Sequence, residues 1–508
     1  MMPSNAVEVD AKATTFENVD RVAGSQKSGE LWGVAAIELK RTLARKHQAR
    51  FIGQRQRCVE RNAYYYRCLY RLLRFIVEPR SRVLNVRCQM GQFLAALEPK
   101  RAVGVEISDE MVRLCRELHP DVECHRADPE TFATDEKFDY VVVNDISDTV
   151  DVLAVLRQAQ QMCHPHTRLV VYNYNYLWQP LLSLAGRLGI RTPLLEPNWF
   201  TEHDVTGLLN ISGFELIKIH KSVLIPIWIP LLSEFVNRVV ARLPGLRRLC
   251  LVQMIVARPR PVQLAAHEVS VSVIIPCKNE RDNVQLAIER LPSMGRHVEI
   301  IFCDDRSTDG TGDEVRRLQS LYPEKDIRLV EGPGISKSEN VWTGFRAARG
   351  DVLMILDGDL AVMPEELPYF FDALVSGQGE FINGSRLVYQ MQRHAMKYSN
   401  YVGNWFFAHV FSFLLEQRIK DTLCGTKVLW RRDWLRIEPL LHSWGVTDRW
   451  GDFELLFGAA RRHLRVVDLP VHYQERIHGI TKMTRVVANG MRMLGMCIAA
   501  LFNLKMQY

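Results

Sequence analysis

Short apolar runs alternate with amphipathic stretches along most of this chain. Between residues 81 and 257 the runs include RVLNV, AVGVEI, FDYVVVND and RLVVYN, and from residue 269 the pattern restarts with VSVIIP, HVEIIFCDD, IRLVEG and DVLMILDGD. Buried strands that alternate with helices are typical of a parallel sheet with helical crossovers. The pattern therefore predicts an α/β protein with two doubly wound domains.

The spacing of apolar residues also divides the chain. Residues 1–30 are polar and without period, so we expect a disordered tail. Residues 31–80 have helical spacing with many Arg and Lys between the apolar positions, which predicts a basic helical segment. The first domain is expected at 81–258, a Pro-rich linker at 259–268, and the second domain at 269–508, ending in an amphipathic helix.

Composition narrows the class of protein. A chain of 508 residues suggests two or three domains, and 24% charged residues are typical of soluble globular proteins. The net charge of +7 is too small to indicate nucleic-acid binding, but it suits work beside anionic phosphates or lipid headgroups. Eleven cysteines without a C-x-x-C pair argue against a disulfide framework and a zinc site, and they favour a reducing cytosol.

The sequence allows two interpretations of its apolar and basic segments, with and without membrane contact. The first thirty residues lack the apolar core of a signal peptide, and no apolar run reaches the roughly 20 residues that a membrane span needs. The apolar segments 223–232 and 483–505 are either buried core elements or helices in the membrane interface. The basic residues of 31–80 form either a solvated helix face or a contact with a membrane or partner. In the membrane interpretation Arg485, Arg492 and Lys505 meet headgroups, and Leu494, Ile498, Leu501 and Phe502 enter the acyl boundary.

The strongest local signal is the D-G-D sequence from Asp357 to Asp359, directly after the apolar run VLMIL. Two carboxylates two residues apart, beside a glycine, suit a hard divalent cation that also binds phosphate oxygens. Mg²⁺ or Mn²⁺ held there would bridge a diphosphate and neutralise the charge on a leaving nucleotide. Taken alone, the same pair is more often a helix cap or a turn.

Other predicted strands also end in polar residues. The sequence IPCKNE ends the first strand of the second domain at 275–280, and CDDRSTDGT follows the second strand at 303–311. NGSR lies at 383–386, and YQERIHGITKM at 473–483 brings two basic residues near its end. Because ligands of open α/β sheets bind beyond the carboxyl ends of the strands, these segments predict one shared site.

Together these ordered motifs, from about Val269 to Met483, resemble the family 2 glycosyltransferases of GT-A fold, and most closely the polyprenyl-phosphate (dolichyl-phosphate) hexose synthases. The resemblance implies an inverting transfer of a hexose from a nucleotide-sugar donor to a polyprenyl phosphate. The enzyme would be cytoplasmic and peripheral, at the inner face of a membrane. Donor contacts are implied for Pro276, Lys278, Glu280, Asp304, Asp305, Asp357 and Asp359, the last two as metal ligands, and phosphate contacts for Arg386, Arg476 and Lys482.

The sequence departs from this family in three places. Lys278 stands where a tyrosine is usual, so the choice of nucleobase stays open. The loop GISKSEN at 334–340 is altered, although Lys337 is retained. The family's typical C-terminal membrane spans do not follow Lys505.

Two acids, Asp452 and Glu454, occupy the position of acceptor-side acids in related enzymes. An alcohol acceptor needs a carboxylate base, whereas a lipid phosphate is already ionised and needs positive charge instead. Because residues i and i+2 do not share one helix face, only one of the two is expected in the site. We assign Glu454 to it, with a surface or capping role as the alternative. The segment DTLCGTK at 421–427 either belongs to a lipid-phosphate site or forms a helix-to-strand turn.

The sequence VLNVRCQMG at 83–91 resembles the cofactor loop of class I S-adenosylmethionine-dependent methyltransferases. The resemblance implies a Rossmann-like domain with Gly91, Glu106 and Asp128 as cofactor contacts. However, Arg87 and Gln89 replace two glycines, and their side chains would fill space that the cofactor needs. We therefore expect a non-catalytic scaffold that does not bind S-adenosylmethionine tightly.

Three functions remain to be compared. The first is glycosyl transfer to a polyprenyl phosphate at a membrane surface. The second is a bifunctional methyltransferase and glycosyltransferase that acts on a glycan or glycolipid. The third is a binding module, which would require the D-G-D sequence to be idle. The nearly intact donor motifs and the altered cofactor loop favour the first.

Overall fold

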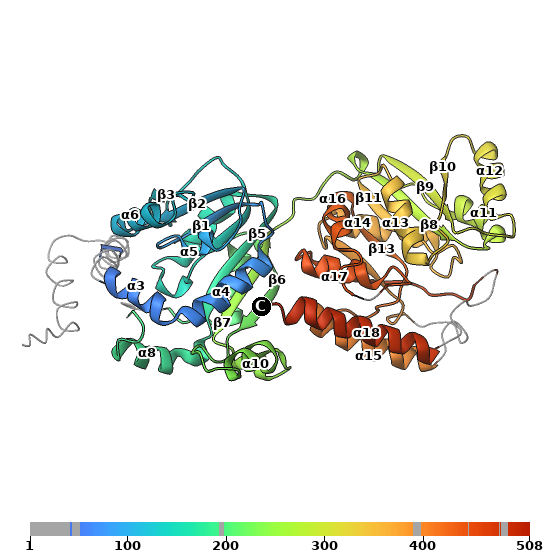
Figure 1. The fold of residues 1–508 in the computed structure, drawn as a ribbon. Coiled ribbons are helices and arrows are strands. Elements are labelled where there is room, and N and C mark those ends of the chain that lie inside the picture. The colour runs from blue at the N-terminus through green and yellow to red at the C-terminus, as the bar shows by residue number, and fades with distance from the viewer. Residues whose placement is uncertain are drawn as a thin grey trace, which may run out of the picture.

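The computed structural model describes residues 41–42, 51–192, 198–389, 398–445, 447–476, 478 and 486–508. The chain forms two lobes, each built around a seven-stranded sheet (Figure 1). The prediction of two α/β domains is therefore confirmed. The predicted tail at 1–30, Lys482 and Arg485 lie outside the described residues.

The first sheet has the strand order β3-β2-β1-β4-β5-β7-β6. All neighbours are parallel except β7, which is antiparallel to both β5 and β6. The strands are β1 (Arg82–Val86), β2 (Arg101–Glu106), β3 (Glu123–Arg126), β4 (Phe138–Val143), β5 (Cys163–Tyr174), β6 (Phe214–Ser222) and β7 (Val252–Pro259). The helices between them are α5 (Gln92–Ala95), α6 (Asp109–Leu118), α7 (Val152–Gln161), α8 (Gln179–Arg187), α9 (Glu202–Ile211) and α10 (Leu232–Arg238).

Two helices precede this sheet, α3 (Ile52–Arg61) and α4 (Ala63–Ile76). The apolar face of α4 is buried in the core of the first domain through Tyr65, Leu69 and Leu72, so this part of the basic segment is integral to that domain. The apolar positions three and four residues apart explain why the segment folds as a helix against the sheet.

The second sheet has the order β10-β9-β8-β11-β13-β12-β14, with β13 antiparallel to both neighbours. Its strands are β8 (Ser270–Cys277), β9 (His297–Asp304), β10 (Asp326–Glu331), β11 (Val352–Ile355), β12 (Phe381–Ser385), β13 (Lys427–Trp430) and β14 (Val466–Pro470). The helices are α11 (Arg281–Arg290), α12 (Thr311–Leu321), α13 (Lys337–Ala347), α14 (Leu367–Val375), α15 (Tyr398–Leu415), α16 (Arg431–Ile437), α17 (Phe453–Arg461) and α18 (Val486–Lys505).

Helices α15 and α18 lie side by side below the second sheet (Figure 1). Within the described residues, neither these nor any other helix is long and apolar enough to cross a bilayer. One prediction about α18 is wrong: Lys505 does not reach outward, because its ammonium is buried and lies 2.6 Å from the carboxylate of Glu416. Leu494, Ile498 and Phe502 are exposed, as the membrane interpretation requires, but Leu501 is partly buried against the core of the second domain.

The chain end returns to the first domain. Tyr508 is buried in the core that contains α4, with its ring 4.7 Å from that of Phe75 and its hydroxyl 3.1 Å from Nδ1 of His220. The guanidinium of Arg242 lies 4.0 Å above the Tyr508 ring. The last helix of the second domain is thereby attached to the first domain.

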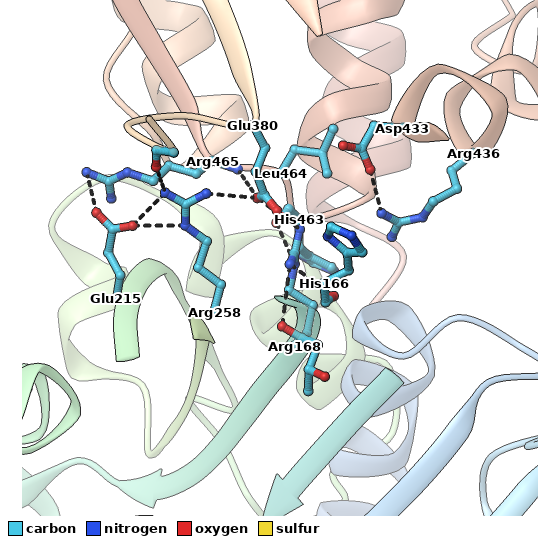
Figure 2. A network of polar contacts seen from close by, with 12 residues as sticks. His166, Arg168, Glu215, Arg258, Glu380, Asp433, Arg436, His463, Leu464 and Arg465 are labelled. Atoms are coloured by element: carbon cyan, nitrogen blue, oxygen red, sulfur yellow. Dashed lines mark hydrogen bonds and ion pairs between the residues drawn. The ribbon is translucent and has the colours of Figure 1, made fainter. Parts of the chain in front are cut away.

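Buried ion pairs join the two domains (Figure 2). Arg168 of β5 donates both Nη2 hydrogens to the carboxylate of Glu380, at 2.9 Å to each oxygen, and its Nε bonds the carbonyl of His463. Arg258 of β7 pairs with Glu215 of its own domain at 2.7 Å and donates to the carbonyl of Gly377, in the second domain, at 2.6 Å. Because the charges on both sides are paired, the domain orientation is fixed by directional contacts rather than by apolar packing alone.

Candidate active site

A cavity of about 370 Å³ lies at the carboxyl ends of β8 and β11. Seven residues that the sequence predicted line it: Pro276, Lys278, Glu280, Asp305, Asp357, Asp359 and Arg476. Lys337 lines it as well, at the start of α13. Strand ends far apart in the sequence therefore meet at one site, as the parallel topology requires.

Asp357 and Asp359 follow β11 and face two cations. Nζ of Lys337 lies 2.5 Å from Oδ1 of Asp357, and Nη2 of Arg476 lies 2.8 Å from Oδ2 of Asp359. Burial and the charge of Asp357 raise the pKa of Asp359, whereas Lys337 outweighs burial and holds the pKa of Asp357 below its ordinary value. Paired carboxylates with flanking cations are a setting for phosphate oxygens and a hard metal ion.

The turn at 421–427 makes room for this acid pair. A side chain at Gly425 would place its Cβ 2.2 Å from Oδ2 of Asp357, which is too close for any atom pair that is not bonded. The absence of a side chain there lets the Asp357 carboxylate lie against the backbone of the turn. The segment is thus packed directly behind the D-G-D sequence.

The other end of the cavity carries a second charge pair. Nζ of Lys278 lies 3.1 Å from Oδ2 of Asp305, and the backbone N–H of Gly334 donates to Oδ1 of Asp305 at 2.7 Å. Asp304 is turned differently: its Oδ1 accepts from the N–H of Ser307 at 3.1 Å, and it is not among the cavity-lining residues. The structure therefore brings Asp305, but not the Asp304 side chain, to the cavity.

Arg386 is held by a buried partner. Its guanidinium bonds both carboxylate oxygens of Asp421, at 2.7 and 2.9 Å, and lies 5.1 Å from the ring of Tyr473. Burial raises the pKa of Asp421, but the charge of Arg386 outweighs it and lowers that pKa to about 2. Arg386 does not line the cavity, so it contributes through the 421–427 turn rather than by direct contact.

The two predicted acceptor-side acids point in different directions. Oε1 of Glu454 accepts from the N–H of His442 at 2.9 Å, and burial raises its pKa to about 7. Asp452 instead pairs with Lys427 at 2.7 Å, and the charge of Lys337, a cavity residue, also acts on it. Neither acid is among the residues that line the cavity, and of the two only Asp452 is affected by the charge of a lining residue, Lys337.

Four lining residues lie outside the motifs that were predicted to form this site. Arg449 and Trp450 precede the Asp452 motif, and Asn489 and Arg492 come from α18. The sequence TDRWGD carries a signal for the first two, because Arg and Trp beside an acid in a predicted loop are unusual for a solvated turn. Arg492 was expected to contact lipid headgroups. In the structure it lines the cavity, so the helix predicted to contact the membrane also borders the site.

The first domain has a closed cofactor loop. Arg87 and Gln89 adopt left-handed backbone conformations, with φ of 59° and 56°, where glycine is the favoured residue. The Arg87 guanidinium crosses the site, 2.7 Å from a carboxylate oxygen of Asp148 and 2.9 Å from the hydroxyl of Thr149. The space left beside Arg87 and Asp128 is about 40 Å³, whereas small-molecule sites need about 300 Å³ or more.

Two of the residues predicted to contact the cofactor instead bond backbone N–H groups of the protein. The Glu106 carboxylate accepts from the backbone N–H groups of Gln89 and Ile107, both at 2.9 Å, and Oδ1 of Asp128 accepts from the N–H of Glu130 at 2.9 Å. Gly91 has a φ of 80°, and an added Cβ would lie 2.6 Å from Sγ of Cys115. S-adenosylmethionine therefore does not fit the described residues in this arrangement.

Comparison with known proteins finds two family matches. Residues 272–437 match the model of glycosyl transferase family 2, and residues 83–166 match that of a methyltransferase domain. Both resemblances predicted from the sequence are thereby confirmed.

Individual relatives match part of the chain. A dolichol-phosphate mannosyltransferase of Pyrococcus furiosus is 40% identical over 120 residues, 23% of this chain and 33% of that protein. An undecaprenyl-phosphate 4-deoxy-4-formamido-L-arabinose transferase of Edwardsiella ictaluri is 30% identical over 111 residues, 21% of this chain and 34% of that protein. The chain thus spans about a third of the length of these relatives. The crystal structure of glucosyl-3-phosphoglycerate synthase from Mycobacterium tuberculosis with uridine diphosphate is 16% identical, with a TM-score of 0.35, and covers 46% of this chain and 80% of that one.

Proposed function

Because the chain carries a family 2 glycosyltransferase segment, we propose that it transfers a hexose from a nucleotide-sugar donor to a polyprenyl phosphate. The observation that carries the proposal is the cavity in which the Asp357–Asp359 pair, the Lys278–Asp305 pair and Arg476 meet. The relatives named for dolichol-phosphate and undecaprenyl-phosphate support this acceptor class.

The donor end is assigned to the residues around Lys278. Pro276, Glu280 and Asp305 bind the nucleoside, with Lys278 in place of a stacking tyrosine. Asp359, with Asp357, would hold Mg²⁺ or Mn²⁺, and the metal ion would neutralise charge on the leaving diphosphate. Lys337 pairs with Asp357 and adds a fixed positive charge on the same side of the cavity.

The acceptor end needs cations rather than a base. An oxygen of the lipid phosphate attacks the anomeric carbon of the hexose, a new carbon–oxygen bond forms, and the bond to the nucleoside diphosphate breaks with inversion. The attacking oxygen carries no proton to remove, so no carboxylate base is required. Arg476 holds the phosphate from the cavity wall, assisted by Arg492 and by the predicted Lys482. Glu454 remains a predicted site residue, and Arg386 acts by positioning the 421–427 turn.

The location and the first domain complete the proposal. We place the enzyme in the cytoplasm, peripheral at the inner face of a membrane, where polyprenyl phosphates are accessible. The first domain is a scaffold without methyl transfer, because Arg87 occupies the cofactor loop.

Metal dependence tests this proposal. Transfer of labelled sugar to polyprenyl phosphate by the purified full-length chain should be lost in EDTA and restored by Mg²⁺ or Mn²⁺. Full activity in the chelator would contradict the assigned role of the D-G-D sequence.

A further inference from the structure

One side of the first domain exposes apolar side chains of α8 and of the segment that leads into α10. Helix α8 has no buried residue at all, and its Leu181, Leu184 and the following Leu188 are 50% or more exposed. A helix with this composition needs an apolar surface to cover it, since water does not stabilise exposed leucines.

The neighbouring loop presents apolar residues outward on a fixed backbone. Ser233 is fully buried, and its hydroxyl accepts from the N–H of Ile229 at 2.9 Å and donates to the carbonyl of Ile227 at 2.7 Å. Asn237 is also buried and accepts from two N–H groups at the start of the loop. With these polar groups inside, Trp228 is 53% and Leu231 87% exposed, and Leu231 has a left-handed φ of 63°. This loop therefore buries polar side chains and exposes apolar ones, the opposite of an ordinary solvated loop.

The second domain also exposes apolar residues, on two of its helices. Trp405 and Phe406 of α15 are exposed, as are Ile498 and Phe502 of α18. In Figure 1 the helices α8, α10, α15 and α18 all lie along the lower side of the two lobes. Because the buried pair of Arg168 and Glu380 fixes the domain orientation, the exposed apolar residues of the two domains keep the same position relative to each other. We call the set formed by α8, residues 226–238, α15 and α18 the apolar face.

We propose that the apolar face docks on an anionic lipid bilayer, and that the first domain supplies its own half of this attachment. The charges around the face favour this occupant. Its four segments carry the exposed basic residues Arg187 and Arg492, and their acid, Glu234, is paired with Arg71 and Arg238. Basic residues beside exposed apolar ones are the pattern of an interfacial attachment to anionic lipid.

A second cavity lies beside the apolar face. It measures about 210 Å³, and its lining mixes apolar residues, among them Leu181 and Ile227 of the apolar face, with charged ones such as Arg55, Asp145 and Arg191. The inference deepens the proposed function, which requires a lipid-borne acceptor, and places the cavity wall residue Arg492 of α18 beside the membrane plane.

Flotation with vesicles that contain no polyprenyl phosphate tests the proposal. The full-length chain should float with phosphatidylcholine vesicles that contain phosphatidylglycerol, and less with phosphatidylcholine alone or at high salt. The double variant Leu184→Asp/Leu231→Asp should lose binding by about tenfold or more. The matched control Leu118→Asp alters a 49% exposed leucine on α6 and should bind like the parent protein. Thermal melting of each variant checks the fold.

Position at the bilayer gives a second measurement. Brominated lipids should quench part of the tryptophan fluorescence, and Trp228→Phe should remove part of that quenching while the protein still floats. The proposal is overturned if the parent does not bind either vesicle, if the double variant binds equally well, or if Leu231 instead mediates self-association in solution. Vesicle binding without sugar transfer to polyprenyl phosphate would refute the proposed function and leave this inference standing. Sugar transfer, together with parent-like vesicle binding by the double variant, would refute this inference and leave the proposed function standing.

Discussion

Asp359 and Asp357 differ in their partners, and this difference predicts unequal effects of substitution. Asp357 pairs with Lys337 and Asp359 with Arg476, but burial and the adjacent carboxylate still raise the pKa of Asp359, so this acid gains most from a metal ion. We expect Asp359→Ala to lower kcat by about 10²-fold or more, and Asp357→Ala by less, because losing a direct ligand removes several kcal/mol of charge stabilisation. Steady-state transfer rates of the two variants check the order, and equal or reversed losses would contradict it.

Glu454 predicts a dependence of stability on pH. Its folded pKa is raised to about 7 by burial, whereas the unfolded carboxyl ionises near 4.5. The stability that the bound proton contributes is full below about pH 4.5 and is lost as the pH rises through 7. We therefore expect Glu454→Gln to increase the free energy of unfolding by about 1–2 kcal/mol at pH 8 and by little at pH 5.

Denaturant unfolding of both proteins at the two pH values measures this effect. Equal gains at pH 5 and pH 8 would mean that the carboxyl is not perturbed. The same variant also tests the sequence-based assignment of Glu454 to the site. Transfer should persist if the residue only bonds the N–H of His442, and it should be lost if the carboxylate contacts substrate.

The residues that could be assigned from sequence were those fixed by strand ends. Pro276, Asp305 and Asp359 follow apolar strands, and parallel topology carries them to one edge. The choice between Asp452 and Glu454 could not be made, because it depends on which side of α17 faces Lys427 and Lys337. The rotation of α17 about its axis is set by tertiary packing, and the spacing of residues in the sequence does not reveal it.

At the scale of elements, the loop after β1 predicts that the first domain does not bind S-adenosylmethionine tightly. Arg87 lies across the site that S-adenosylmethionine would occupy and is bonded to Asp148 and Thr149. Isothermal titration of the full-length chain should show no binding in the low micromolar range. Arg87→Gly together with Gln89→Gly restores the glycines that the left-handed backbone favours, and tighter binding by this variant would support the steric explanation. A low micromolar dissociation constant for the parent would show that the loop opens.

Most elements followed from the apolar pattern, and the exceptions have a common cause. The strands VLMIL and FDYVVV are uninterrupted apolar runs, so their burial was evident. The segments 223–232 and 483–505 stayed ambiguous because a buried element and an interfacial one have the same composition. Only the tertiary structure separates Lys505, which is buried against Glu416, from the exposed Phe502 three residues earlier.

At the scale of the whole molecule, the buried pair between the domains predicts coupled unfolding. Arg168→Met leaves the Glu380 carboxylate buried without its bidentate partner, which should cost about 3–5 kcal/mol. Arg316→Met is the matched control, because Arg316 and Asp313 form an exposed pair within α12, whose loss should cost less than about 1 kcal/mol. Thermal and denaturant unfolding compare the two. A cost for Arg168→Met no greater than for the control would show that the interface does not depend on this pair.

The central claim is that this chain joins a sugar to a lipid phosphate. Mass spectrometry of the lipid fraction tests it most directly, after incubation of the purified full-length chain with polyprenyl phosphate, a panel of nucleotide sugars and Mg²⁺ or Mn²⁺. We expect a polyprenyl phosphate heavier by one hexose residue with at least one donor, and no such product in EDTA or with Asp359→Ala. Sugar found only on a water-soluble acceptor, with the polyprenyl phosphate unchanged for every donor, would contradict it.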